Sequence, residues 1–221
     1  MTWIVAIDGP AGAGKSTTAR RAAEALGFAF LDTGAMYRAA TWWALHNGVD
    51  LDDAAALAAS TEAMQLEIAE AGGRQRVTVG GRDVTEAIRT PEVTRLIYRV
   101  DQNPAVRRRL VALQRELGAR GPTVAEGRDI GTVVFPDAAC KVYLDASLDE
   151  RTRRRARELE ARGIAVDFDA LRAEIHDRDE KNKNRQQSPL RQADDAVLVD
   201  TTAMSPDEVV HAIVRLARER L

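Results

Sequence analysis

The amino-acid sequence predicts an α/β fold in which helices flank a doubly wound, parallel sheet of five strands. Two observations predict it. Five short apolar segments alternate with longer stretches whose apolar residues recur at helical spacing, which is typical of strands buried on both faces. Four of the five segments run directly into a polar cluster, and in an open parallel sheet ligands bind beyond the carboxyl ends of the strands. We expect strands at residues 4–7, 28–31, 123–125, 141–144 and 197–199.

The composition fits one soluble globular unit. The 221 residues are 45% hydrophobic and 30% charged, with a net charge of −2. That balance does not favour a nucleic-acid polymer as partner. Arginine is clustered at 107–109 and 153–155, which favours small anionic ligands. We expect the single cysteine, Cys140, to be a buried core residue. No secretory leader and no apolar stretch of membrane-spanning length is recognisable, so we expect a cytoplasmic protein with no membrane partner.

The first predicted strand leads into residues 9–16, Gly-Pro-Ala-Gly-Ala-Gly-Lys-Ser, which we call the phosphate loop. They match G-x-x-x-x-G-K-[ST], the P-loop pattern, between a strand and a helix. Glycines let successive N–H groups turn toward a phosphate, and the helix N-terminus adds a positive dipole. Lys15 would contact the outer phosphates, and the Ser16 hydroxyl would bind Mg²⁺. We therefore expect ATP contacts from Gly9, Pro10, Ala11, Gly12, Ala13, Gly14, Lys15, Ser16 and Thr17.

The next elements follow in order along the chain. Residues 16–26 are expected to be helical, with Gly27 as the stop. The second strand ends in Asp32-Thr33-Gly34, and Arg38 lies one helical turn later. Arg38 either grips an acceptor phosphate or is a solvated arginine on a capped helix. The tryptophan pair at 42–43 is expected to pack in the core.

Residues 60–90 interrupt the parallel pattern. Apolar and polar residues alternate there between Gly-Gly pairs at 72–73 and 80–81, which predicts a small antiparallel meander. Such an insert is either a separate lobe that closes over a substrate or a decorative insertion.

Two further segments carry candidate site residues. After the expected helix 104–117, the third strand ends in Glu126-Gly127-Arg128-Asp129. Glu126 suits a water-mediated hold on magnesium, while Arg128 and Asp129 either project into the cleft or pair with each other. In the run 171–185, an apolar helix face turns polar at its far end, provided that the helix persists. That face carries Leu171, Ile175, Arg178, Asn182 and Arg185. A last helix is expected from Pro206.

The fourth strand runs into Asp145-Ala146-Ser147, and the first into Asp8-Gly9. We expect all four polar clusters to converge on one site.

Among nucleotide-handling classes, these features favour a small-molecule kinase. The further motifs of switch GTPases are absent from the sequence, and motor or transport ATPases usually need more chain. A kinase needs the loop, a magnesium-linked carboxylate, an acceptor-phosphate pocket and mobile arginines, and each has a candidate here. Three alternatives stay open: a kinase for another acceptor such as UMP, AMP or shikimate, a non-catalytic nucleotide-binding module, and an RNA-binding role.

The motifs together resemble the bacterial cytidylate kinase family. The matching stretches run in order over nearly the whole chain, and Asp-Thr-Gly-Ala-Met-Tyr-Arg and Gly-Arg-Asp-Ile-Gly-Thr-Val-Val-Phe-Pro are the most specific. They lie at residues 7–16, 31–38, 88–93, 104–107, 127–136 and 178–190.

The resemblance implies phosphorylation of CMP and dCMP by MgATP through direct in-line transfer. It also implies one kinase unit, which we expect to be a monomer. The unit would have a core at about 1–35, 104–150 and 168–221, a monophosphate-binding lobe at about 36–103 with its insert at 60–90, and a lid at about 151–167.

Site residues carry over from the family by position. Thr33 and Arg38 fall on the acceptor site, Arg107 and Asp129 on base recognition, and Arg128 on phosphate. Arg178 and Arg185 fall on the arginines that bridge the two phosphates, so the catalytic candidates are Lys15, Arg128, Arg178 and Arg185. The pattern does not decide which of Arg151, Arg154 and Arg155 contacts ATP; we take Arg154 as the candidate.

Two positions depart from the family pattern. Tyr98 stands where the family often has a serine against the cytosine, and Asn182 stands where it often has an aspartate against the sugar hydroxyl. Asparagine accepts the same hydrogen bond without charge, so preference between CMP and dCMP is expected to differ from that of relatives.

Overall fold

A parallel sheet of five strands forms the centre of the molecule. The computed structural model describes residues 3–71, 74–161 and 163–220. The strands are β1 (Ile4–Asp8), β2 (Ala29–Asp32), β6 (Thr123–Glu126), β7 (Cys140–Asp145) and β8 (Val197–Asp200). They lie in the order β2-β6-β1-β7-β8, and every pairing between them is parallel. All five predicted strands are confirmed, each within a residue or two of its predicted bounds.

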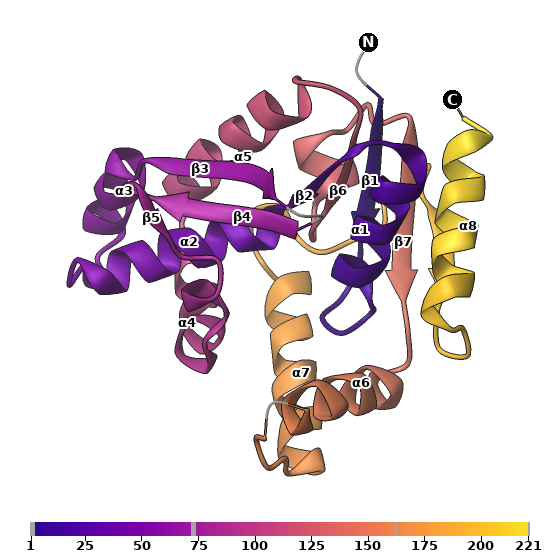
Figure 1. Cartoon of the computed structure of the whole chain (residues 1–221). Helices are drawn as coiled ribbons and strands as arrows, with labels where there is room; N and C mark the ends of the chain where they lie inside the picture. Colours follow the sequence, from indigo (N-terminus) through magenta and orange to yellow (C-terminus); the bar gives the residue numbers. More distant parts are fainter. Residues whose placement is uncertain (1–2, 72–73, 162, 221) are drawn as a thin grey trace.

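Helices cover both faces of this sheet, because alternate strand residues point to opposite faces. On one face, Val5 and Ile7 pack with α1 (Lys15–Leu26) and α8 (Pro206–Arg218). On the other face, Ala6 packs with α2 (Thr33–His46) and α5 (Pro104–Gly118). Figure 1 shows α8 running alongside the strands close to α1. The predicted helices at 16–26, 104–117 and from Pro206 are confirmed, and Cys140 is buried in the first of these cores.

Side chains that cap helices fix where several of them begin. The Asp32 carboxylate accepts from the backbone N–H of Ala35 at the start of α2. A capping box joins Ser205 and Glu208 at the start of α8. These caps satisfy backbone donors that have no partner inside the helix. In α2 this cap places Thr33 at the carboxyl end of β2.

The predicted antiparallel insert is present. It consists of β3 (Leu66–Ala71), β4 (Arg74–Val79) and β5 (Arg82–Asp83). Gly80 and Gly81 form the second turn at φ of 55° and 76°, whereas the turn at 72–73 lies outside the described residues. Residues 60–63 belong to α3 (Ala54–Ala63) rather than to the meander. Val77 and Val79 are buried in the same core as Met36, so the insert packs on α2.

Two regions flank the sheet at the mouth of the site. One contains η1 (Ala87–Arg89) and α4 (Pro91–Asp101). The other contains α6 (Leu148–Glu160) and α7 (Phe168–Lys183), which pack on each other below the sheet in Figure 1. Residues 151–160 of the predicted lid at 151–167 thus belong to α6. Among the described residues no helix is both long and apolar enough to cross a membrane.

Candidate active site

One large cavity opens at the carboxyl ends of β2 and β6. Its volume is about 880 Å³. The phosphate loop, the start of α2 and the polar residues after β6 form its walls together with α4, α6 and α7. The site residues predicted from the sequence that line it are Ala11, Gly12, Ala13, Gly14, Lys15, Ser16, Thr17, Thr33, Arg38, Arg107, Glu126, Arg128, Asp129, Arg154, Arg178, Asn182 and Arg185.

The phosphate loop has the backbone that its glycines permit. Gly12 and Gly14 adopt φ of 78° and 88°, in the left-handed region. Gly9 lies behind the cavity, where a Cβ would come within 2.0 Å of the carbonyl oxygen of Leu144. Pro10 also lies behind it, and its carbonyl oxygen accepts from Lys15 Nζ at 2.7 Å. Gly9 and Pro10 therefore shape the loop from outside the cavity.

Lys15 is buried with its charge poorly compensated. The pKa of its ammonium is lowered to about 7, because burial and the positive charges of Arg128 and Arg178 outweigh the negative charges of Glu126 and Asp8. A phosphate at the loop would supply the missing negative charge. Lys15 thus lies in surroundings that favour an anionic ligand.

Ser16 and Glu126 face each other across the end of the sheet. The Ser16 hydroxyl donates to Glu126 Oε1. Burial raises the pKa of Glu126 to about 7, with the charge of Asp32 acting in the same direction. A hydroxyl and a carboxylate are hard oxygen ligands, which suit Mg²⁺ bound together with substrate phosphates. The described residues contain no cluster of three or more His, Cys, Asp or Glu that would hold a metal alone, so the donor set fits a magnesium ion that arrives with a nucleotide.

Three arginines face one another across the cavity from this pair. Arg38 donates to Thr94 Oγ1 at 2.7 Å, and Arg128 donates to the carbonyl oxygen of Gly127 at 3.2 Å. Arg178 makes no hydrogen bond or ion pair within the part of the chain that the structure describes. Burial, with the charges of Arg128 and Arg38, lowers the pKa of Arg178 to about 9. Converging cations of this kind suit a multiply charged anion.

At the inner end, Arg107 and Asp129 form a buried ion pair. The Arg107 guanidinium also lies 5.3 Å from the centre of the Tyr37 ring. Asp129 therefore pairs with Arg107, and the alternative pairing of Asp129 with Arg128 is wrong. Asn182 lines the same end.

Arg185 lies two residues beyond the end of α7, so the helical face predicted for 171–185 stops short of it. Its Nε donates to the carbonyl oxygen of Ser188 at 3.1 Å, and it lies 3.7 Å from a carboxylate oxygen of Asp101. The loop contact, rather than the helix, aims Arg185 into the cavity.

Tyr98 is not brought into the cavity. Its ring lies on the surface beneath the ammonium of Lys181, 4.5 Å from the ring centre. Ile97 and Asp101 of the same helix line the wall instead. Two of the four polar clusters expected at the site also point elsewhere. Asp8 accepts from the backbone N–H groups of Ile130 and Gly131 at 2.7 Å each, and Asp145 accepts from that of Ala146 at 2.8 Å.

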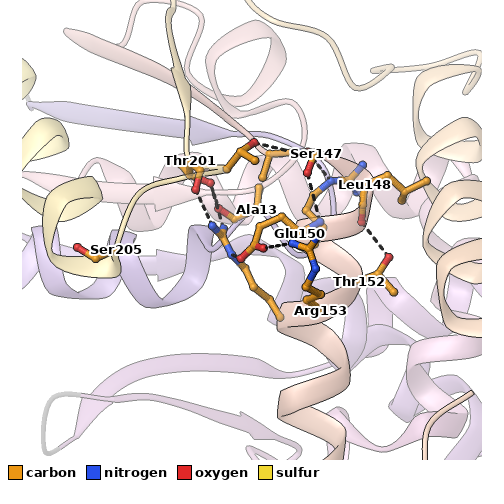
Figure 2. Close-up of polar contacts among 12 residues, drawn as sticks. Ala13, Ser147, Leu148, Glu150, Thr152, Arg153, Thr201 and Ser205 are labelled. Atoms are coloured by element: carbon orange, nitrogen blue, oxygen red, sulfur yellow. Dashed lines mark hydrogen bonds and ion pairs between the residues drawn. The ribbon is translucent and has the colours of Figure 1, made fainter. Parts of the chain in front are cut away.

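The loop after β8 contributes a part of the site that sequence reasoning missed. Figure 2 shows Thr201 close to Ala13 of the phosphate loop and to Glu150 of α6. Arg154 joins them, because it donates to Thr201 Oγ1 at 3.0 Å, to Thr201 O at 2.6 Å and to Glu150 Oε1 at 3.0 Å. The signal was available, since this loop also follows the carboxyl end of a parallel strand. Other lining residues that were not predicted include Arg89, Thr94, Asp101, Met204, Ser205, Pro206 and Val209.

A family model described as cytidylate kinase matches residues 5–219. The chain belongs to the cytidylate kinase family. A bifunctional pantoate ligase/cytidylate kinase of Synechococcus sp. (strain WH7803) is 53% identical over 220 residues, which cover 99% of this chain and 45% of that protein. A protein of the same description from Prochlorococcus marinus (strain MIT 9303) is 50% identical, over 97% of this chain and 44% of its own length. The chain thus spans about 45% of the length of these curated relatives.

Solved structures of small-molecule kinases share the fold. A gluconokinase from Sinorhizobium meliloti 1021 is similar with a TM-score of 0.50 at 16% identity, over 99% of this chain and 94% of that one. A shikimate kinase from Acinetobacter baumannii in complex with shikimate has a TM-score of 0.50 at 18% identity, with the same coverage of 99% and 94%. At these identities the likeness shows the fold alone.

Proposed function

We propose that this chain phosphorylates CMP and dCMP, with ATP as the phosphoryl donor. Family membership supports the reaction class. The observation that carries the proposal is that one cavity of about 880 Å³ has two different sides, each suited to a phosphate group. The phosphate loop with Lys15 forms one side, and the converging arginines Arg38, Arg128 and Arg178 form the other. Two anionic substrates fit there with a phosphoryl group between them.

The proposed mechanism is direct in-line transfer. The acceptor phosphate is already an anion and a nucleophile, so the protein needs neither a general base nor a covalent intermediate. Its residues position the two substrates and neutralise charge on the transferred group. Lys15 acts from the loop side, and Arg128, Arg178 and Arg185 act from the acceptor side. Ser16 and Glu126 would hold Mg²⁺, which when bound neutralises charge on the outer phosphates of ATP.

Base and sugar recognition are proposed at the inner end of the cavity. Arg107 and Asp129 hold each other in a fixed orientation and present a donor and an acceptor side by side. Such a pair suits the polar edge of cytosine. Thr33 and Arg38 would orient the acceptor phosphate, and Asn182 would accept from a sugar hydroxyl.

The first experiment is a coupled ADP-release assay with MgATP against CMP, dCMP, UMP, AMP, GMP and shikimate. Fastest turnover on CMP and dCMP supports the proposal. Faster turnover on another acceptor retains the kinase mechanism and rejects the assignment of Arg107 and Asp129. ATP binding without acceptor-dependent turnover rejects the enzyme in favour of a nucleotide-binding module.

Sugar selectivity gives a second test, on Asn182. We expect Asn182→Asp to shift the ratio of kcat/KM for CMP over dCMP by about 3- to 10-fold, because a charged acceptor binds a hydroxyl more strongly. Asn184→Asp is the matched control, since Asn184 is exposed two residues further on. An unchanged CMP to dCMP ratio in Asn182→Asp would remove Asn182 from sugar recognition.

We further propose that the chain is a single kinase unit that acts on small-molecule substrates, and that it works as a monomer in the cytoplasm. The lobe at about 36–103 with its insert at 60–90 and the lid at about 151–167 would close on the core. The separate small core of Ala156, Leu171 and Ile175 under α6 and α7 supports a lid that moves as a body. Small-angle scattering with and without both substrates, together with light scattering for the mass, tests closure and oligomeric state.

A further inference from the structure

A buried ion pair grips the phosphate loop at one residue. Arg151 of α6 and Asp179 of α7 are joined, with side chains only 9% and 5% exposed. Asp179 Oδ1 accepts from the backbone N–H of Ala11 at 3.3 Å. The Arg151 guanidinium donates to the carbonyl oxygen of Ala11 at 3.0 Å. Both backbone polar groups of Ala11 are therefore held by the two members of the same ion pair.

Arg151 is held in place on its other side as well. Its Nε donates to the carbonyl oxygen of Ala146, in the connection between β7 and α6, at 2.9 Å. The Cβ of Arg151 also lies close to Gly12: a side chain added at Gly12 would place its own Cβ 3.1 Å from it. Neither Arg151 nor Asp179 is among the residues that line the cavity. The pair thus lies behind the loop and has no surface toward a substrate.

The pair sits beside the cationic residues that do face the cavity. Asp179 directly follows Arg178, and Arg151 lies one helical turn before Arg154. One joint therefore connects the phosphate loop to both helices that carry these arginines. Catalysis by positioned charges is sensitive to such joints, because a displacement of about 1 Å can lower the rate by about 100-fold.

We propose that Arg151 and Asp179 are positioning residues for phosphoryl transfer, which set Arg178 and Arg154 in register with the phosphate loop. The inference rests on the proposed kinase function. It also removes Arg151 from the three candidates for direct contact with ATP. The pair acts only through Ala11 and its two helices, so its loss changes the rate of transfer more than the affinity for either substrate.

The test uses the full chain and two substitutions of Asp179. Asp179→Asn keeps an acceptor for the Ala11 N–H and removes the charge, whereas Asp179→Glu keeps the charge and moves it by one methylene. We expect kcat to fall about 10- to 100-fold in both variants, with KM for ATP and for CMP each within about 3-fold of wild type. Circular dichroism and a thermal melt select an assay temperature at which every variant is folded.

A second ion pair between the same helices is the matched control. Arg172 of α7 contacts Asp149 of α6 at 2.7 Å, both side chains are about half exposed, and neither residue lines the cavity. Asp149→Asn should leave kcat within about 2-fold of wild type. Arg151→Met combined with Asp179→Asn should be no slower than the slower single variant, because the two residues act as one unit.

The outcomes separate the inference from the proposed function. A wild-type chain without acceptor-dependent turnover rejects the proposed function, whatever the variants do. If wild type turns over and folded Asp179→Glu keeps wild-type kcat, the pair only supports the fold and the inference is overturned. If ATP affinity falls as far as kcat does, Asp179 belongs to the binding site and is not a positioning residue.

Discussion

The two halves of the cavity are built in opposite ways. On the phosphate-loop side several polar groups have protein partners: Pro10 O accepts from Lys15, Thr201 and Glu150 accept from Arg154, and a buried ion pair binds both backbone groups of Ala11. On the acceptor side, Arg38, Arg128 and Arg178 face one another, and Arg178 has no hydrogen-bond or ion-pair partner among the described residues. The protein holds the first half through these contacts, whereas in the second half the cations mainly face one another.

This difference shows where the protein stores unfavourable electrostatic energy. Cations buried near one another destabilise the folded chain, as the lowered pKa values of Arg178 and Arg38 indicate. A bound anion relieves that repulsion and so stabilises the fold. Substitutions on the two sides should therefore affect activity and stability in different proportions, and four predictions test this.

The largest effect is expected at Lys15. Lys15→Ala removes the point charge aimed at the outer phosphates, and we expect kcat to fall by about 10³-fold or more. The coupled ADP-release assay measures it, with Lys183→Ala, a change at an exposed lysine, as the control. Wild-type turnover in Lys15→Ala would show that phosphoryl transfer takes place away from the loop.

Arg178 should separate activity from stability. Arg178→Ala is expected to lower kcat by about 10²- to 10³-fold, because a positioned charge on the transferred group is lost. Its unfolding free energy should stay equal to wild type or rise, since a partly buried charge with no hydrogen-bond or ion-pair partner among the described residues disappears. The coupled ADP-release assay measures kcat, and urea denaturation with and without CMP measures the unfolding free energy and its rise on binding. If Arg178→Ala lowered the unfolding free energy as much as Asp179→Asn does, the two halves of the cavity would not differ in this respect.

Asp8 ends β1 behind the cavity, and its carboxylate accepts from the backbone N–H groups of Ile130 and Gly131. Burial raises the pKa of Asp8 to about 6 from 3.8, although two backbone N–H groups oppose this shift. A carboxyl with a raised folded-state pKa favours the native state below its unfolded pKa, and this contribution is lost as the pH rises through 6. Between pH 4 and 6.5, wild type should lose about 2 to 3 kcal/mol of unfolding free energy through this group.

The measurement is a series of urea melts between pH 4 and 7 on wild type and Asp8→Asn. The difference between the two curves should change over this range, and Asp137→Asn, at an exposed carboxylate, should run parallel to wild type. Parallel curves for all three proteins would show that Asp8 titrates alike in the folded and unfolded states.

The smallest effect is expected at Thr201. Thr201→Val keeps the buried shape and removes the hydroxyl that accepts from Arg154. Because Arg154 retains the carbonyl of Thr201 and the carboxylate of Glu150, we expect only about a 5-fold rise in KM for ATP, with KM for CMP unchanged. Thr202→Val is the control, since Thr202 holds Ser147 and Asp200 but not Arg154. Equal effects of both variants would assign the change to the loop as a whole.

Most of the fold could be predicted because its signals are local. Each strand is a short apolar run, and the phosphate loop is contiguous in the sequence. Glu126 and Arg128 were also found, since they directly follow a strand. Asp8 and Asp145 obey the same rule yet bind neighbouring backbone. A carboxylate at a strand end can either face the site or accept from nearby backbone N–H groups. The packing of distant segments decides which of the two it does.

The same limit explains the other differences. Asp129 pairs with Arg107 of α5 rather than with the adjacent Arg128, and adjacency in the sequence gives no information on that contact. Tyr98 lies on the edge of a helix face whose neighbours Ile97 and Asp101 line the cavity. Helical spacing places a residue near a site but does not decide to which side a long ring turns. The hydrogen bond from Arg154 to Thr201 joins α6 to the loop after β8, and the two residues are 47 positions apart.

The contacts that complete the phosphate loop have a consequence for synthesis of the chain. Ala11 is held by residues 140 and 168 positions further on, and the carbonyl of Ala13 accepts from Thr201, 188 positions further on. A ribosome therefore releases the loop long before it releases the partners that fix its shape. Until β8 has joined the sheet, a nascent chain carries the nucleotide-binding motif without a finished nucleotide site. The contact between Thr201 and Ala13 therefore forms only after β8 has been made and has joined the sheet, which makes it a contact of high sequence separation.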